Sequence, residues 1–276
     1  MSFADKVFID TCKDILTNGF WDTELDVRPR WEDGTPAHTV KKFGVVNRYD
    51  LSKEFPAQTI RKTFIKSAVD EILWIWQKKS NNIADLGSHV WDSWADENGS
   101  IGKAYGYQLG VKHHYHEGEM DQVDRVLFDL KNNPQSRRIL TNIYVHQDLS
   151  EMALYPCAYS MTFNVSGNKL NAILNQRSQD MLAANAWNVA QYAALTHMFA
   201  QVSGLEVGEF VHVIADAHIY DRHVPIIEEL ISRTPYDAPE FVMDKSITDF
   251  YQFTKDSFSF ENYKFHDFSE KIPVAI

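Results

Sequence analysis

The chain has 276 residues, 44% of them hydrophobic, which is enough for a large globular core. Its net charge of −11, from 27 Lys and Arg against 38 Asp and Glu, argues against a nucleic-acid-binding protein, which needs a basic face. No run approaches the ~20 apolar residues of a membrane span, and charged residues interrupt the N-terminus where a signal peptide would be apolar. Cys12 and Cys157 make no disulfide framework, so we expect a reduced, cytoplasmic protein.

The N-terminal part predicts a helix, a loop and a strand. Apolar residues recur at helical spacing over residues 3 to 17. Proline and glycine mark residues 26 to 38 as a loop, which carries Arg28 and Arg30. A strand is expected from Thr39 to Asn47.

A long amphipathic helix is predicted from Gln58 to Lys79. Apolar residues lie four apart along it, from Ile60 to Trp76, and Glu71 sits beside this track. An acid in such a place usually turns to solvent, whereas a minority are pocket acids with a raised pKa. Both interpretations stay open.

Aromatic side chains follow this helix. Trp91 and Trp94 have a spacing typical of a core, and they could also form the floor of an aromatic ligand site. Tyr105 comes directly before a glycine. The next loop holds three histidines but is polar and has no second ligand cluster, so we expect it to be solvated and to bind no metal. These histidines are His113, His114 and His116.

The middle of the chain predicts a helix from Asp121 to Asn132, followed by two adjacent arginines, Arg137 and Arg138. Most such pairs are solvated, but two guanidiniums beside a helix end can also hold a phosphate. Residues Ile139 to Val145 predict a strand.

A β-hairpin is predicted next. Residues 159 to 165 alternate in polarity, Ser-Gly-Asn turns the chain, and residues 170 to 175 return. Cys157 and Arg177 therefore extend the outer ends of paired strands and should lie roughly opposite each other. A guanidinium near a thiol favours the thiolate, although a lone cysteine is more often structural than catalytic.

The C-terminal part predicts a buried helix from Met181 to Val202, with Asn188 near its start. A strand over residues 210 to 220 would place His218 and Tyr220 on one face, and a helix should follow over residues 224 to 231. The last residues, PVAI, could fray or close over a site as a lid. Strands and helices in irregular order indicate one α+β domain over residues 1–276, with a mixed sheet packed against helices.

Ten segments, in one order, resemble the thymidylate synthase family from about Asp26 to Ile276. They are DGTPAHT, EILWIWQ, HVWDSWADENG, AYGYQLG, NNPQSRR, ALYPC, QRSQD, WNVAQY, DAHIYDRH and PVAI. The resemblance implies reductive methylation of dUMP to dTMP, with 5,10-methylenetetrahydrofolate as one-carbon and hydride donor and dihydrofolate as product. It also implies a homodimer formed through the sheet, and no metal.

The resemblance assigns roles to residues of this chain, with Cys157 as the nucleophile. The other catalytic residues would be Glu71, Tyr105, Asp180 and Asn188. Residues that bind dUMP would be Arg28, Arg137, Arg138, Gln176, Arg177, Ser178, Asp180, Asn188, His218 and Tyr220, with Arg30 as a rival to Arg28. Arg137 and Arg138 would reach the site of the other subunit. The folate would contact Val90, Trp91, Trp94, Leu154, Asp180 and Ile276.

Some positions depart from the family pattern. The common segment LGLPFN reads AANAWN here, from Ala183 to Asn188, so that Ala184 replaces a glycine and Trp187 a phenylalanine. Ala158 stands where a histidine is frequent, and Ala215 where a glycine is usual.

Three other functions remain open. A pyrimidine hydroxymethylase of the same fold would use the same cysteine but let water trap the methylene intermediate. A non-catalytic nucleotide- or RNA-binding relative is a second alternative. A thiol hydrolase using Cys157 and His218 is a third, although nothing in the sequence marks an oxyanion hole.

Overall fold

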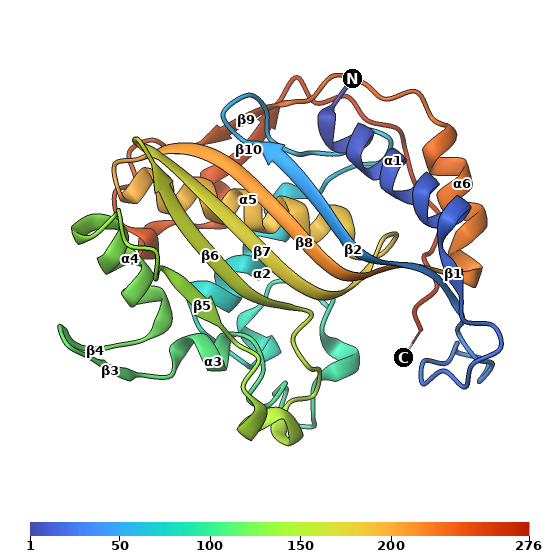
Figure 1. Ribbon diagram of the computed structural model, residues 1–276, viewed down its shortest axis with the longest axis horizontal. Helices are drawn as coiled ribbons and strands as arrows, with labels where there is room; N and C mark the ends of the chain where they lie inside the picture. Colours follow the sequence, from blue (N-terminus) through green and yellow to red (C-terminus); the bar gives the residue numbers. More distant parts are fainter. Residues whose placement is uncertain (276) are drawn as a thin grey trace.

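A six-stranded mixed sheet organises the computed structural model, which describes residues 1–275 (Figure 1). The spatial order is β1-β2-β8-β7-β6-β5, in which β7 and β8 run parallel and the other neighbours antiparallel. The strands are β1 (Phe20–Trp21), β2 (Thr39–Asp50), β5 (Leu140–Asn142), β6 (Ala158–Ser166), β7 (Lys169–Asp180) and β8 (Glu206–Tyr220). The predicted α+β class with a mixed sheet is confirmed.

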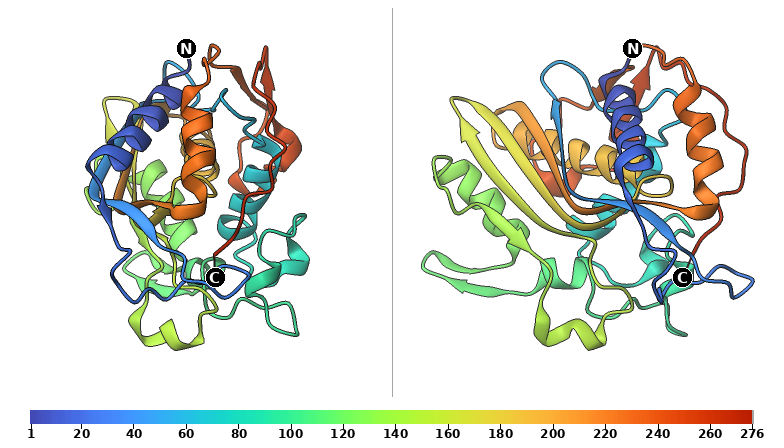
Figure 2. Two further views of the ribbon diagram at one scale, coloured as in Figure 1. Left: turned by 90° about the vertical axis from the view of Figure 1, so that its right-hand side faces the viewer. Right: turned by 45° about the vertical axis from the view of Figure 1, so that its right-hand side comes forward.

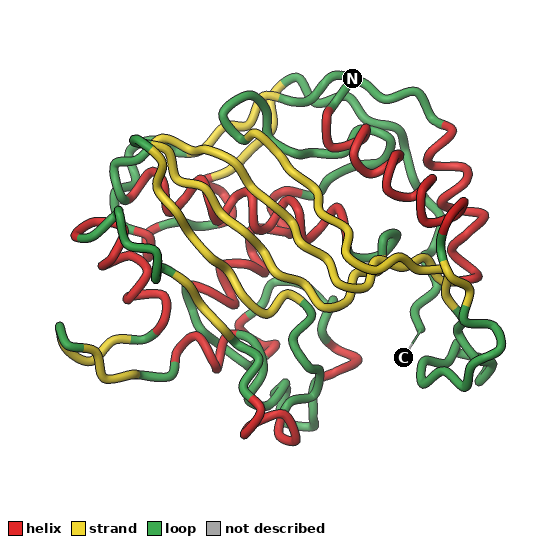
Figure 3. The backbone as a smooth tube through the Cα atoms, in the orientation of Figure 1, coloured by secondary structure: helices red, strands yellow, loops and turns green. Residues whose placement is uncertain are grey.

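Helices α2 (Ile65–Trp76) and α5 (Asn185–Val202) lie behind the sheet in Figure 1 and cover one of its faces. Helices α1 (Phe3–Asn18) and α6 (Val224–Ser232) lie side by side, and α1 runs along β2 (Figure 2). The smaller elements, drawn in Figure 3, surround these layers. They are α3 (Gly106–Gly110), α4 (Gln122–Asn132), β3 (His113–Tyr115), β4 (Gly118–Met120), β9 (Glu240–Met243), β10 (Phe258–Glu261) and the 3-10 turns Ile83–Asp85, Asp92–Trp94, His146–Glu151, Asp221–His223, Phe250–Gln252 and Lys255–Ser257.

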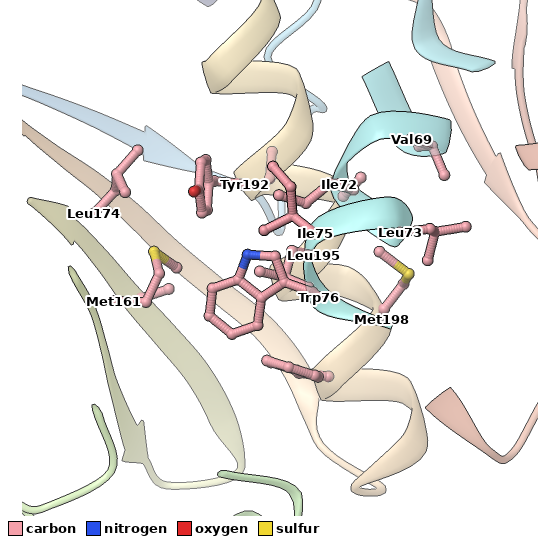
Figure 4. Packing of buried hydrophobic residues seen from close by; sticks show 14 of the residues in the cluster. Val69, Ile72, Leu73, Ile75, Trp76, Met161, Leu174, Tyr192, Leu195 and Met198 are labelled. Carbon is pink, nitrogen blue, oxygen red and sulfur yellow. The ribbon is translucent and has the colours of Figure 1, made fainter. Parts of the chain in front are cut away.

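The main core lies between the sheet and the α2–α5 pair. In Figure 4, Trp76 of α2 packs among Tyr192 and Leu195 of α5 and Met161 of β6. Helix α5 is buried almost all round, as its apolar sequence predicts. Each fully buried side chain of this size contributes roughly 1.5–3 kcal/mol, so this layer anchors the helices that carry Glu71 and Asn188.

The opposite face of the sheet is open over its central strands. One row of residues in register crosses five strands, namely Leu140, Thr162, Ile173, Val211 and Arg48. Leu140 is 50% exposed and Ile173 38%, and Val46 of β2 adds another exposed apolar side chain at 51%. Val211, between Ile173 and Arg48 in this row, is only 6% exposed, so the exposed apolar side chains of this face do not form one continuous patch.

The predicted helix from Gln58 begins seven residues later, at Ile65. Asp5 of α1 is buried and accepts hydrogen bonds from the backbone N–H groups of Thr59, at 2.9 Å, and Ile60, at 3.3 Å. These bonds hold the segment in turns, and the carboxylate that makes them lies more than fifty positions away in the chain. The periodic pattern was therefore right about the face of the helix and wrong about its start.

Two further predicted boundaries are wrong for similar reasons. Helix α5 begins at Asn185 rather than Met181, because the carboxylate of Asp180 accepts the N–H groups of the intervening turn. Strand β5 stops at Asn142, whose backbone N–H and C=O are both bonded by the side chain of Gln122 on α4. No helix within residues 1–275 has the length and apolar character to cross a membrane.

Candidate active site

Cys157 and Arg177 face each other at the end of the predicted hairpin. The N–H of Arg177 in β7 donates to the carbonyl of Cys157, just before β6, at 2.9 Å. Nη2 of Arg177 lies 3.6 Å from the sulfur of Cys157 and donates to the carbonyl of Tyr155 at 2.7 Å. Burial raises the pKa of the Cys157 thiol, and the Arg177 charge acts against that rise. The Arg177 guanidinium therefore both holds the segment from Tyr155 to Cys157 in place and favours the thiolate form of Cys157.

Tyr105 is the second side chain beside the thiol. The backbone N–H of Cys157 donates to its hydroxyl oxygen at 3.0 Å. Tyr105 has φ 45°, a left-handed conformation, and Gly106 follows it where an added Cβ would lie 2.3 Å from the carbonyl oxygen of Ser80. Burial raises the pKa of Tyr105 well above its ordinary value, so the hydroxyl stays neutral and can donate.

Arg177, which lies beside the Cys157 thiol, also lines a cavity of about 350 Å³. Several of the predicted phosphate and sugar ligands line it together: Arg28, Arg177, Ser178, His218 and Tyr220. Arg30 does not line it and instead donates to the carbonyls of Val27 and Pro29 in its own loop. The geometry therefore favours Arg28 over Arg30 as the cation of this anion site.

Sequence reasoning missed three other charged residues of this cavity, Asp22, Lys41 and Asp216. Asp216 accepts a hydrogen bond from Nδ1 of His218 at 2.8 Å and so orients that ring. Asp216 lies two residues before His218 on the same strand, and this spacing is the signal that could have revealed it.

Asp180 ends β7 and connects the site to the C-terminal segment. One of its oxygens accepts the N–H groups of Leu182, at 2.8 Å, and Ala183, at 2.9 Å, and lies 3.6 Å from Nδ1 of His223. Burial acts to raise the pKa of Asp180, but its close contact with His223 outweighs burial and holds that pKa below the usual range. The other nitrogen of His223 donates to the carbonyl of Pro273 at 2.8 Å. The tail segment that includes Pro273 runs to the same end of the molecule as the loop that carries Arg28 (Figure 2).

Asn188 lies among amides rather than in the apolar surroundings that its sequence neighbours predict. Its Oδ1 accepts from Nε2 of Gln176 at 3.1 Å, and its Nδ2 donates to Gln191 at 3.1 Å. Gln176 in turn accepts from Nε2 of His212 at 2.8 Å. His212 is fully buried, and desolvation lowers its pKa to about 3, so it is a neutral donor that fixes which way the Gln176 amide points. Sequence reasoning missed Gln191 and His212, because only the fold brings them beside Asn188.

Glu71 is a buried acid rather than one turned to solvent, and it does not line the cavity of about 350 Å³. It is only 6% exposed, and burial raises its pKa. Nε1 of Trp187, in the first turn of α5, donates to its Oε2 at 2.8 Å. The acid therefore faces the interface of α2 and α5 rather than solvent.

A second cavity, of about 430 Å³, lies on the other side of Trp187. Aromatic and aliphatic side chains line it together with two cations: Phe64, Trp187, Phe265, Phe268, Ile272, Arg61 and Lys62. Apart from Trp187, sequence reasoning missed these residues, since the phenylalanines of the tail have no periodicity. The flat walls and the cations fit a planar aromatic molecule that carries carboxylates.

Within residues 1–275, none of the predicted folate residues lines the second cavity. Trp91 is buried with its ring 5.1 Å from that of Tyr105, Trp94 and Leu154 are half-buried, and Val90 is 46% exposed. Ile276 lies outside the described residues.

Arg137 and Arg138 are exposed and line neither cavity. The structure does not bring them to the thiol of their own chain. The loop histidines lie in the β3–β4 hairpin, where His113 and His114 are exposed. Within residues 1–275, no group of three or more His, Cys, Asp or Glu side chains is arranged to hold a metal ion.

A thiol beside an arginine-lined cavity, on a mixed sheet backed by two helices, defines an enzyme that attacks a small anionic substrate through covalent catalysis. The family model of thymidylate synthase matches residues 6–276, and the chain belongs to the thymidylate synthase family.

Named relatives agree with this assignment. The thymidylate synthase of Bacillus phage phi3T is 45% identical over 272 residues, which cover 97% of each chain. Thymidylate synthase 1 of Bacillus subtilis (strain 168) has the same identity and coverage. The solved structure of a thermostable thymidylate synthase A from Bacillus subtilis superposes with a TM-score of 0.95 at 43% identity, and the match covers 100% of both chains.

Proposed function

We propose that this chain is a thymidylate synthase that methylates dUMP to dTMP, as one catalytic domain over residues 1–276. The observation that carries the proposal is the pairing of the Cys157 thiol with Arg177, which also lines the anion cavity. One guanidinium thus links a covalent nucleophile to the place where a phosphate would bind.

The substrate is assigned to the first cavity. Arg28, Arg177 and Ser178 hold the phosphate, while His218 and Tyr220 hold the sugar hydroxyl. Gln176, Asp180 and Asn188 surround the pyrimidine. The amide network around Asn188 supports a role in reading the base, since it fixes the donor and acceptor ends of that side chain.

In the proposed reaction the protein supplies the nucleophile and the side chains that donate hydrogen bonds and transfer protons. The thiolate of Cys157 adds to carbon 6 of uracil, which turns carbon 5 into a nucleophile. Tyr105 is kept neutral by burial, so its hydroxyl can donate a hydrogen bond beside the thiol. Glu71, whose pKa is raised by burial, transfers a proton during the reaction. 5,10-Methylenetetrahydrofolate supplies the one-carbon unit and the hydride when it is bound, and leaves as dihydrofolate.

The folate is assigned to the region around the second cavity. Trp187 and the tail phenylalanines offer flat walls for its rings, and Arg61 and Lys62 offer charge for its carboxylates. Trp91, Trp94, Val90, Leu154 and Asp180 are assigned to the folate as well, and the C-terminal residue Ile276 is assigned to closure over it.

We further propose a homodimer formed through the open face of the sheet. Leu140, Ile173 and Val46 are exposed apolar side chains on this face, which a partner subunit would cover, and β5 begins two residues after Arg138. In such a dimer these arginines would reach the phosphate of the partner's site.

Mixing inactive Cys157→Ser subunits with inactive Arg138→Glu subunits should restore activity, because some hybrid dimers carry one undamaged site. No recovery after confirmed subunit exchange would contradict the sharing.

The direct test of the function is to mix the protein with dUMP and methylenetetrahydrofolate and to follow dihydrofolate by absorbance. A hydroxymethylase would leave tetrahydrofolate and give no such signal. Cys157→Ser should abolish turnover and leave dUMP binding nearly intact. Retention of a tenth of the wild-type rate would be incompatible with a nucleophilic role.

Both cysteines are free thiols, which supports a cytoplasmic location.

A further inference from the structure

We propose that Trp187 is a positioning residue for Glu71, whose indole N–H holds one oxygen of the buried carboxylate and stabilises its charge. The side chain that forms a wall of the second cavity would then also set the protonation of the acid behind it. This inference rests on the proposed function for the proton-transfer role of Glu71, but the hydrogen bond itself can be tested independently.

The two side chains are directly hydrogen-bonded, and only Trp187 can be the donor. Nε1 of Trp187 lies 2.8 Å from Oε2 of Glu71, and an indole nitrogen can only donate. A hydrogen bond to an ionised carboxylate is shorter and stronger than one to a neutral acid. The bond therefore favours the charged form of Glu71.

Apart from Trp187, the groups that stabilise the charge of Glu71 are uncharged: the side chains of Gln191 and Trp91 also act to lower its pKa, each less than the Trp187 indole does. Within residues 1–275, no Lys, Arg or His forms an ion pair with this carboxylate. The groups that face it are Gln191 and Tyr192 of α5 and Trp91. Burial raises the pKa of Tyr192 far above neutrality, so it stays uncharged. The Trp187 indole is the largest influence that opposes the effect of burial on Glu71.

The same ring links two parts of the site. Trp187 is half-buried, with one side toward Glu71 and another lining the cavity of about 430 Å³. A planar molecule that packs against this ring would hold it in place, and with it the carboxylate. Helices α2 and α5, which carry the two residues, are anchored by the main core, so their separation is fixed.

The test is Trp187→Phe, which keeps an aromatic ring but removes the donor. Trp21→Phe, on the exposed strand β1, is the matched control. Infrared difference titration against Glu71→Gln isolates the carboxyl of Glu71 in each protein. We expect its midpoint to rise by roughly one to two pH units in Trp187→Phe, the shift that corresponds to a lost hydrogen bond to a charged group. It should not move in Trp21→Phe.

Kinetics give a second measurement. The limb of the pH profile of kcat that Glu71 controls should move to higher pH by the same amount, with the KM for dUMP nearly unchanged. Replacing Trp187 by benzothienylalanine, which has the shape of the indole but no N–H, should reproduce the shift if the phenylalanine variant folds poorly.

Two results separate this inference from the proposed function. An unmoved Glu71 midpoint in a folded Trp187→Phe or benzothienylalanine protein would overturn the positioning role. A wild type that makes no dihydrofolate would overturn the proposed function, while the infrared titration would still decide whether Trp187 holds Glu71.

Discussion

Replacing Arg177 by Gln should raise the pKa of the Cys157 thiol. The guanidinium nitrogen lies 3.6 Å from the sulfur. At that distance a unit charge interacts with a thiolate by about 1 kcal/mol in bulk water and about 5 kcal/mol at an effective dielectric constant of ~20. The thiol is half-buried, between these limits. At 1.36 kcal/mol per unit, the expected rise in pKa is about one to three units.

The assay is the pH dependence of alkylation of Cys157 by iodoacetamide. A profile is needed, because a thiolate of higher pKa is also more nucleophilic and partly offsets its lower abundance at any one pH. Cys12 should stay silent, since it is fully buried and burial raises its pKa far above neutrality. The Cys157→Ser protein provides the background, and Arg222→Gln, which alters an exposed arginine, provides the charge-matched control.

A second variant separates charge from geometry. Arg177→Lys keeps a cation but cannot reproduce the fork that donates to Pro156 at 3.0 Å and Tyr155 at 2.7 Å. We expect a smaller pKa shift than in Arg177→Gln but a clear loss of turnover, because the cysteine loop is less firmly held. An alkylation midpoint in Arg177→Gln equal to that of the wild type would refute the electrostatic reasoning.

Three other predictions follow from the same structure. Asn188→Asp should shift preference from dUMP toward dCMP by roughly ten- to a hundred-fold, measured by steady-state rates with both nucleotides, and an unchanged ratio would show that Asn188 does not read the base. The pKa of His223 is raised: burial lowers it, but Asp180 outweighs burial. The stability that protonated His223 contributes should be fully present below a pH of about 6.5, its pKa in the unfolded chain. It should be lost as the pH rises through the higher pKa of the folded state. Urea unfolding of His223→Asn should lack that dependence. Leu195→Ala should lower the free energy of unfolding by about 2–5 kcal/mol, since Leu195 is fully buried, and a loss under 1 kcal/mol would contradict its place in the core.

Much of the fold could be read from local patterns. The hairpin that pairs β6 with β7 follows from alternation around a Ser-Gly-Asn turn, and it correctly placed Cys157 opposite Arg177. The faces of α2 and α5 follow from their apolar periodicity. The mixed α+β class follows from the order of the elements. These features depend on residues close together in the chain, which is why the sequence alone was sufficient.

Other features depend on side chains far apart in the chain, and only the tertiary structure decided them. Glu71 could have faced solvent on a helix surface, but packing of α2 against α5 buried it and gave it Trp187 as a donor. Asn188 has apolar neighbours in sequence, yet the fold surrounds it with Gln176 and Gln191. The sequence by itself determined which groups are available for the chemistry. Burial and cross-chain hydrogen bonds, which no local pattern encodes, determined their pKa values and orientations.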